Sequence, residues 1–190
     1  LVLGAMPGGQ GTFVLRAGTL DLSGAIQTGS GNGALVIDGG TLDLRTTASA
    51  SLSNLVLAST PGSVASQTIR GTQRWTVGTA TVGQKGTGEL RQNGGTMSIS
   101  GNLQLGGEVG SAGTYRLRAG VLEVAGNITR GGGGPGTLVI DGGALNAGGN
   151  IAVDSLRLGT ELSRSGELLL NGGSMTSSEV KVGESGSGKL

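Results

Sequence analysis

The feature that most constrains this chain is a repeated unit of two short alternating apolar segments joined by a glycine corner. The unit is clearest at residues 33–44, GALVIDGGTLDL, where apolar side chains alternate on both sides of a pair of glycines. A period of two residues is that of a β-strand, so each unit predicts two short strands meeting at a corner. Six units begin with glycine and a degenerate one begins with alanine: Gly11, Gly33, Ala65, Gly88, Gly113, Gly136 and Gly166.

A third short segment ends in glycine or alanine before most of these units. It reads LVLG at 1–4, LVLA at 55–58, ATVG at 80–83, LQLG at 103–106, LRLG at 156–159 and VKVG at 180–183. With a partial unit at Gly188, successive units start 22–32 residues apart. A coil of three short strands is typical of a solenoid in which like strands of neighbouring turns pair in parallel. We therefore expect an all-β chain that forms a parallel β-helix, a β-solenoid of about eight rungs.

The alternation also predicts which side chains point into the coil. Counted from each starting residue, offsets two, four, nine and eleven should point inward, as at Leu35, Ile37, Leu42 and Leu44. Offset ten should face solvent. Offset three is an exception, because it also carries apolar side chains in four units, at Val14, Val36, Val139 and Leu169.

A longer period is superimposed on the short one. VIDGG at 36–40 returns at 139–143. We interpret residues 1–190 as a single β-solenoid segment with internal repeats at approximately 1–102 and 103–190, two tandem four-rung blocks. Each block has one long step, of 32 and then 30 residues, which we interpret as enlarged turns at Arg45–Asn54 and Ala147–Ser155. Because loops carry recognition on repeat scaffolds, these turns are where we first expect a ligand site.

Composition excludes several classes of function. Glycine supplies 42 of 190 residues without a strict three-residue period, which excludes collagen. Cysteine and histidine are both absent, which excludes disulfides, thiol nucleophiles and histidine-dependent triads. The 13 basic and 12 acidic residues are scattered, so we expect no nucleic-acid partner. No apolar run approaches the length of a membrane helix, so we expect no membrane-spanning segment.

Carboxylates are the only candidates for catalysis. Asp21, Asp43 and Glu123 all stand at offset ten, in what should be one outward column. On adjacent rungs, the first two would lie about 5 Å apart, which suits a retaining glycosidase pair or a calcium site. A solvated face is the simpler interpretation. We therefore assign no catalytic, cofactor-binding or metal-binding residue, and expect neither enzyme activity nor a cofactor.

Three further features have mainly structural interpretations. Aspartate or asparagine precedes the paired glycines, at Asp38, Asn93, Asp141 and Asn171, where such side chains commonly bond their own backbone in a turn. Trp75 lies in the degenerate unit and either fills a gap in the coil or forms a local binding feature. Residues 183–189, GESGSGK, match most of a phosphate-binding loop, but Leu190 follows the lysine and no helix is expected there. We therefore expect no nucleotide site.

The quoted motifs resemble those of a known class of surface protein. GALVIDGGTL, GTLVIDGGAL and the segments VGQKGTGEL (82–90) and VGESGSGKL (182–190) are similar to the glycine-rich passenger repeats of bacterial autotransporters and related large surface proteins. The resemblance covers nearly the whole chain and is weakest over residues 58–79. It implies a secreted right-handed β-helix, displayed at or released from a Gram-negative-type cell surface, that serves in adhesion, aggregation or matrix building.

These observations favour a structural extracellular β-solenoid, a stalk, adhesin or passenger segment at the bacterial surface. One alternative is the subunit of an extracellular filament assembled end to end, because Leu1 and Leu190 both fall in mid-rung register. Another is a β-helix that binds or cleaves a polysaccharide. The expected partners are further copies of the same repeat, in a longer parent chain or end to end, and a host surface, matrix or polysaccharide.

Overall fold

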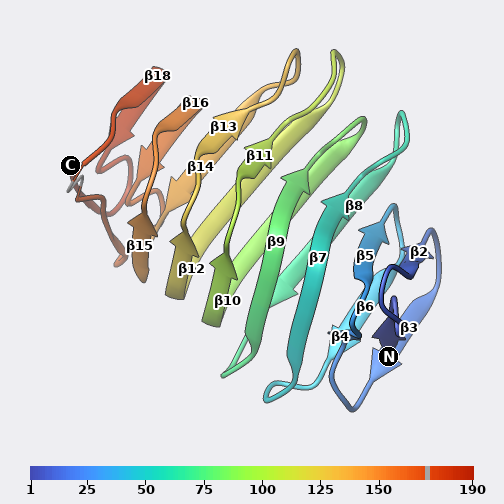
Figure 1. Ribbon diagram of the computed structural model, residues 1–190. Coiled ribbons are helices and arrows are strands. Elements are labelled where there is room, and N and C mark those ends of the chain that lie inside the picture. Colours follow the sequence, from blue (N-terminus) through green and yellow to red (C-terminus); the bar gives the residue numbers. More distant parts are fainter. Residues whose placement is uncertain (170–171) are drawn as a thin grey trace.

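The chain folds as a parallel β-solenoid of about eight turns. A computed structural model describes residues 1–169 and 172–190, and within them 60% strand and no helix are found. Strands of successive turns lie side by side, and the two termini lie at opposite ends of the stack (Figure 1). The expected all-β parallel solenoid is therefore confirmed.

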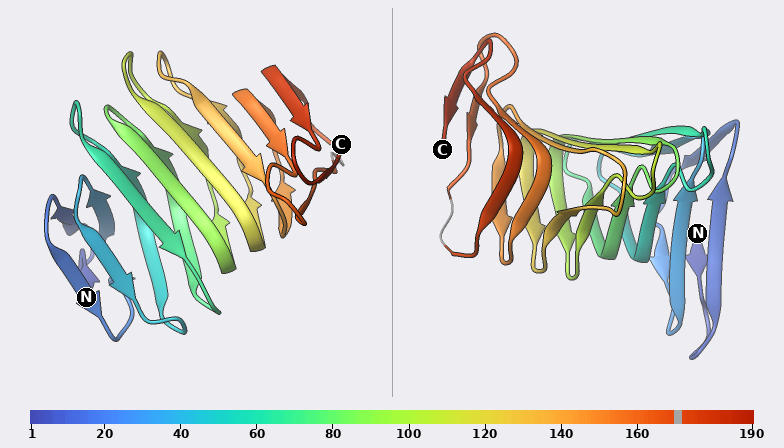
Figure 2. Two further views of the ribbon diagram at one scale, coloured as in Figure 1. Left: turned by 180° about the vertical axis from the view of Figure 1, so that it is seen from behind. Right: turned by 90° about the horizontal axis from the view of Figure 1, so that it is seen from above.

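The described strands have 2 to 13 residues, and all of their pairings are parallel. Seen from behind and from above, they form layers joined by turns at the edges (Figure 2). In chain order they are β1 (Val2–Leu3), β2 (Gln10–Leu15), β3 (Thr19–Leu22), β4 (Gln27–Thr28), β5 (Asn32–Ile37), β6 (Thr41–Leu44), β7 (Ser49–Leu57), β8 (Val64–Ile69), β9 (Arg74–Val82), β10 (Thr87–Ile99), β11 (Leu103–Leu105), β12 (Ala112–Val124), β13 (Ile128–Arg130), β14 (Gly136–Ile140), β15 (Ala144–Ala147), β16 (Ile151–Leu158), β17 (Ser165–Glu167), β18 (Met175–Val182) and β19 (Ser187–Lys189).

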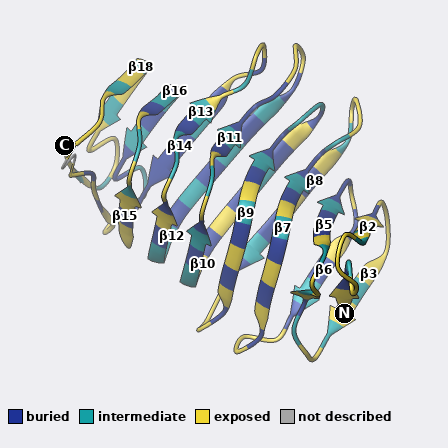
Figure 3. Cartoon of the chain, in the orientation of Figure 1, coloured by how far each residue is buried: buried dark blue, intermediate teal, exposed yellow. Residues whose placement is uncertain are grey.

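Alternating side chains fill the interior of the coil. Buried and exposed residues alternate along β7 and β9 (Figure 3). The inward positions predicted for the best-formed unit, Leu35, Ile37, Leu42 and Leu44, are all buried. At offset three, burial follows position in the stack: Val139 is buried, whereas Val14 and Leu169 near the two ends are exposed. The predicted inward residue Leu170 lies outside the described residues.

The paired glycines form corners, as predicted. The second glycine of three pairs has a positive φ, 67° at Gly95, 75° at Gly143 and 70° at Gly173. Glycine adopts this region without the clash that a Cβ would cause. At Gly94 and Gly95 the corner lies within the continuous strand β10, where the pairing register with β12 shifts. The corner there is a β-bulge rather than a loop.

The two long steps are not enlarged turns, and that interpretation was wrong. Most of 45–54 belongs to β7, and most of 147–155 belongs to β15 and β16. Their side chains alternate as strands require: Ala50 and Leu52 are buried in β7, as are Ile151 and Val153 in β16. The extra residues therefore form additional strand, and the excess length adds to the wall of the solenoid.

The additional strand shifts the repeat unit relative to the faces of the solenoid. In the regular part of the coil, the first strand of a unit pairs with the first strand of the next, as β8 does with β10. At β5 the pairing changes. Ala34 of this first strand lies opposite Asn54 of β7, which is a third strand. The same change occurs at β14, where Thr137 lies opposite Ser155 of β16. We call each change of pairing partner a slip. It occurs because the units that begin at β5 and β14 contain four strand segments, rather than three, before the next unit begins.

A buried aspartate marks each slip. Asp38 accepts hydrogen bonds from the backbone nitrogen of Ser59 at 2.5 Å and from its hydroxyl at 2.8 Å. Asp141 accepts the corresponding pair from Thr160 at 2.5 and 2.8 Å. Both aspartates thus bind the residue that follows the newly paired third strand, rather than their own turn as predicted.

The other members of that Asp/Asn column differ. Asn93 is exposed in β10, where no slip occurs, and Asn171 lies outside the described residues. Within the described part of this column, aspartate is found at the slips and asparagine at the regular corner.

One junction between strands at the first slip lacks a hydrogen-bonded ladder. β6 pairs with β3 and not with β8, although an ion pair between Asp43 and Arg70 joins the two strand ends. A hollow of about 160 Å³ lies between them. The buried side chain of Gln73 joins the segment after β8 to the end of β6 by donating to the carbonyl oxygens of Leu44 and Arg45 at 2.8 and 3.0 Å.

Candidate functional site

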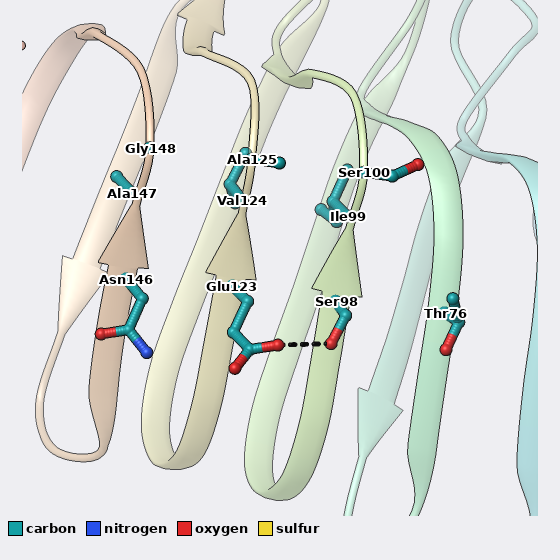
Figure 4. Close-up of a pocket in the computed structure, with 10 residues that line it drawn as sticks. All are labelled: Thr76, Ser98, Ile99, Ser100, Glu123, Val124, Ala125, Asn146, Ala147 and Gly148. Carbon is teal, nitrogen blue, oxygen red and sulfur yellow. Dashed lines mark hydrogen bonds between the residues drawn. The ribbon is translucent and has the colours of Figure 1, made fainter.

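A shallow trench crosses the outer surface of four successive turns. It has a volume of about 450 Å³ and is lined by the second strands of the units and by the turns that follow them. Figure 4 shows its side chains in rows that run across the strands, and therefore along the solenoid axis. The ten lining residues are Thr76, Ser98, Ile99, Ser100, Glu123, Val124, Ala125, Asn146, Ala147 and Gly148. We refer to this feature as the trench.

The strand register places one row of polar side chains along the trench. Thr76 of β9 lies opposite Ser98 of β10, which lies opposite Glu123 of β12, and Asn146 of β15 follows. Adjacent strands are about 4.7–4.9 Å apart, so hydrogen-bonding groups repeat at that interval. The Ser98 hydroxyl donates to a Glu123 carboxylate oxygen at 2.7 Å. Glu123 is the only ionisable side chain among the lining residues.

The floor of the trench consists of small and apolar residues. Ser100, Ala125 and Gly148 occupy equivalent places where the chain turns from the second strand to the third. An asparagine two residues after each of them ties neighbouring turns together. The Asn102 side chain accepts from the backbone of Asn127, and the Asn127 side chain accepts from the backbone of Asn150, both at 2.8 Å. This ladder holds the corners in line and keeps the trench straight.

The three carboxylates predicted to share a column are only partly brought together. Asp21 and Asp43 lie directly opposite one another on β3 and β6, as expected. Glu123 lies in another row, because its neighbours lead through Ser98 and Thr76 to Ser51 of β7. The expectation of a single column was wrong because the slip separates the first two units from those that follow.

The hollow beside Asp21 and Asp43 differs from the trench in chemistry. Its other lining residues are Arg45, Thr46 and Arg70, and Arg70 forms an ion pair with Asp43. That pair neutralises one of the two carboxylates in place. The arrangement therefore resembles a solvated ion-pair surface more than two free carboxylates poised for acid–base chemistry.

Charged side chains elsewhere on the outer surface also pair with one another. Arg116 lies 3.1 Å from Asp141 and 3.7 Å from Glu89, and Arg118 forms an ion pair with Glu161. These contacts join β10, β12 and the segment after β16 around the second slip. They stabilise the slip and do not form a free basic stripe of the kind that binds nucleic acid.

A carboxylate also fixes the glycine-rich turn at residues 131–134. Asp154 accepts a hydrogen bond from the backbone nitrogen of Gly136 at 2.8 Å and one from Arg130 at 2.7 Å. The hydrogen bond from Gly136, with a smaller contribution from Arg130, lowers the pKa of Asp154 below its ordinary value. The turn and Asp154 line a hollow of about 310 Å³. Since both partners of this carboxylate are internal, its role is to hold β16 against the turn.

The remaining sequence motifs have structural roles. The segment resembling a phosphate-binding loop connects β18 to β19, and its Lys189 forms an ion pair with Glu167 at 2.6 Å. Trp75 is fully buried, so it fills the core and offers no ring to a surface ligand. Its indole nitrogen has no hydrogen-bond partner among the described residues.

Neither a metal site nor a catalytic constellation is evident in the described residues. Across residues 1–169 and 172–190, no three side chains of the ligating kinds His, Cys, Asp and Glu come together in a way that would hold an ion. The described chain also contains no helix long and apolar enough to span a membrane.

The trench itself was not predicted from the sequence. Its signal is the recurring run of a small residue, glycine and asparagine at 100–102, 125–127 and 148–150. Small residues at equivalent corners leave space on the outer surface, and neither charge nor step length marks them. Comparison of the chain with protein-family models, curated proteins and solved structures yields no match.

Proposed function

We propose that the chain is a structural, extracellular β-solenoid segment that serves as a stalk or adhesin scaffold at a bacterial surface. The observation that carries the proposal is the parallel pairing that continues from β2 at one end to β18 at the other. Such stacking makes each turn the template for the next and produces an elongated body with its polar groups bonded internally. A rigid spacer requires those properties and needs no catalytic group.

The outer surface supports the same proposal. Most of its charged side chains form ion pairs between neighbouring turns, which join the turns mechanically and leave little net field. The bacterial surface location rests on the resemblance of the glycine-rich units to autotransporter passengers.

Localisation can be tested on intact cells of the source strain. An antibody raised against the purified 190-residue chain should label unpermeabilised cells or precipitate the chain from the culture medium, and protease added outside the cells should remove the surface signal. A cytosolic marker probed in the same samples controls for lysis. Labelling that appears only after permeabilisation would contradict the proposal.

The scaffold role needs its own assay. Displayed on a non-adherent bacterium, the chain should increase attachment or cell–cell aggregation relative to an unrelated β-rich domain displayed at equal density. An unchanged attachment and aggregation at matched display would argue against the adhesin role and leave only that of a spacer.

A further inference from the structure

The trench has the shape of a site for an elongated ligand. It crosses β9, β10, β12 and β15 and runs along the solenoid axis, so an occupant that fills it must extend over several turns. Its polar groups, the hydroxyls of Thr76 and Ser98, the Glu123 carboxylate and the Asn146 amide, come from successive strands. A ligand that uses them all must therefore present polar groups at the strand interval of about 4.7–4.9 Å.

This interval distinguishes between two kinds of linear polymer. An extended peptide advances about 3.3–3.4 Å per residue, so side chains on one face recur at nearly 7 Å and lose register with the turns. A β-1,4-linked pyranose chain is extended and advances by one ring over a distance close to the strand interval, and every ring carries hydroxyl groups. Hydroxyl, amide and carboxylate groups can all bond such hydroxyls.

The charge and the floor of the trench further restrict the class of ligand that can bind. Glu123 is its only ionisable group, and no cationic side chain lines it, so a polyanion would meet repulsion without compensation. Ala125 is exposed, and together with Ala147 and Gly148 it forms a low floor on which a sugar ring can rest its apolar face. A neutral chain of hydroxyl-bearing rings matches these features.

We infer that the trench binds a linear, uncharged β-linked polysaccharide lengthwise, with about one sugar ring per turn of the solenoid. Thr76, Glu123 and Asn146 bond hydroxyl groups along one edge of the glycan. Ser98 donates its proton to Glu123 and accepts from the glycan. The small residues at the corners leave room for the rings. This binding is separate from the scaffold role, since a stalk without it would still act as a spacer.

The binding experiment uses the full chain and defined probes. Cellohexaose, laminarihexaose and chitohexaose are the uncharged β-linked probes, and a polygalacturonate oligomer is the anionic probe. Amide chemical-shift changes are followed during titration. We expect saturable binding of at least one uncharged hexasaccharide, with shifts concentrated at the trench, and little or none of the anionic oligomer. Absence of saturable binding by all three uncharged probes, or equal binding of polygalacturonate, would overturn the inference.

Three variants locate the site, two in the trench and one control outside it. Ala125→Trp places a large exposed side chain on the trench floor and should weaken binding about tenfold or more, while Thr46→Trp makes the same change beside Asp21 and Asp43 and should leave it unchanged. Asn146→Ala removes one exposed hydrogen-bonding group with minimal structural risk and should weaken binding several-fold. It keeps the site testable if Ala125→Trp disturbs the fold. Binding that neither trench variant reduces would place the glycan elsewhere and refute the assignment.

Discussion

At the scale of single residues, the end of the third strand leaves no room for a side chain. Gly83 has a φ of 72°, and a Cβ on it would collide with the backbone carbonyl group of Ala112. Ala58 is the equivalent residue one turn earlier, since Leu57 pairs with Val82, and it adopts a φ of 56° despite its side chain. Ala58 stands at the first slip, so its surroundings differ from those of a regular turn.

Replacement of Gly83 by alanine should therefore destabilise the protein strongly. The left-handed conformation costs an L-residue about 1–2 kcal/mol, and the collision with Ala112 adds about 1–3 kcal/mol of overpacking. Gly62→Ala is the matched control, because Gly62 has a φ of 75° with open space around it. Urea denaturation followed by circular dichroism should show a clearly lower midpoint for Gly83→Ala than for Gly62→Ala. Equal losses would mean that backbone conformation alone accounts for the effect.

The single tyrosine of the chain should make stability depend on pH in the alkaline range. Tyr115 is fully buried and donates a hydrogen bond to the Gln92 side chain at 2.5 Å. Burial raises the pKa of the Tyr115 phenol above its ordinary value, because the anion would lose its hydration. The neutral phenol thus contributes stability that is fully present below the unfolded pKa of about 10 and declines as the pH rises above it.

Tyr115→Phe isolates this contribution from the titration of lysines. At pH 7 the variant should be less stable by about 1–3 kcal/mol, because Gln92 loses its donor in the core. The difference between wild type and variant should shrink as the pH rises above about 10. Urea midpoints over a pH series measure it, and tyrosinate absorbance should appear only on unfolding. A constant difference across the series would show that the phenol does not resist ionisation.

At the scale of the strand, the slips depend on a buried aspartate at each place where the pairing changes. Asp38 is buried at the end of β5 and binds both the backbone and the hydroxyl of Ser59. Asp38→Ala should cost about 1–3 kcal/mol by leaving the Ser59 nitrogen without its acceptor. Asp21→Ala, at an exposed carboxylate, should change stability by less than about 0.5 kcal/mol.

A double-mutant cycle tests whether Asp38 acts through Ser59. The loss from Asp38→Ala and Ser59→Ala together should be smaller than the sum of the two single losses, because residues in one hydrogen-bonded pair are coupled. Urea midpoints of the four proteins provide the measurement. Additive losses would show that the Ser59 hydroxyl is not coupled to Asp38. Asp38 would then act through the backbone nitrogen of Ser59, which Ser59→Ala leaves in place.

The regular turns could be predicted because their signal is local. Alternation of apolar residues decides which side chains of a strand point inward, so Leu35 and Ile37 were assigned correctly. Strand pairing joins residues that are far apart in the sequence, and a long step in the repeat is equally compatible with a loop or an added strand. The buried alternation of Ala50 and Leu52 was the available sign of a strand.

The candidate site was likewise predictable only where it depends on one regular step of the repeat. The adjacency of Asp21 and Asp43 follows from one regular step and was predicted. The separate place of Glu123 depends on the slip between them and therefore could not be read from offsets within the repeat. The trench requires both the register of four turns and the small side chains at their corners, which no single unit displays.

At the scale of the whole molecule, each slip moves the equivalent strands of the repeat to a different face of the solenoid. Before the first slip, the second strands are β3 and β6, and after it the first strand β8 takes the place beside β6, joined by the contact of Asp43 with Arg70. Equivalent outer positions therefore face different directions in successive parts of the chain. The hollow at Asp21 and Asp43 and the trench at Glu123 are equivalent in the repeat but lie on different faces.

Deletion of the added strand should abolish the first slip. Removal of residues 46–53 shortens the step from 32 to 24 residues, which matches the regular turns. First strands should then pair continuously from β2 as far as the second slip at β14, with Ala34 of β5 opposite Ser66 of β8 instead of Asn54. The chain has no native cysteine, so paired cysteines report the register without background. A short thiol crosslinker should join Ala34→Cys to Asn54→Cys in the intact chain and Ala34→Cys to Ser66→Cys in the deleted one.

The two crosslinks separate the possible causes of the slip. If step length sets the pairing, the deletion should exchange one crosslink for the other, while circular dichroism retains a β-rich spectrum. If the deleted chain instead keeps the Ala34–Asn54 crosslink, the pairing is fixed by the strands and by the contact of Asp38 with Ser59, and the added strand is a consequence of the slip. Adding Asp38→Ala to the deleted chain then distinguishes the aspartate from the strand sequence, because only control by the aspartate predicts loss of that crosslink.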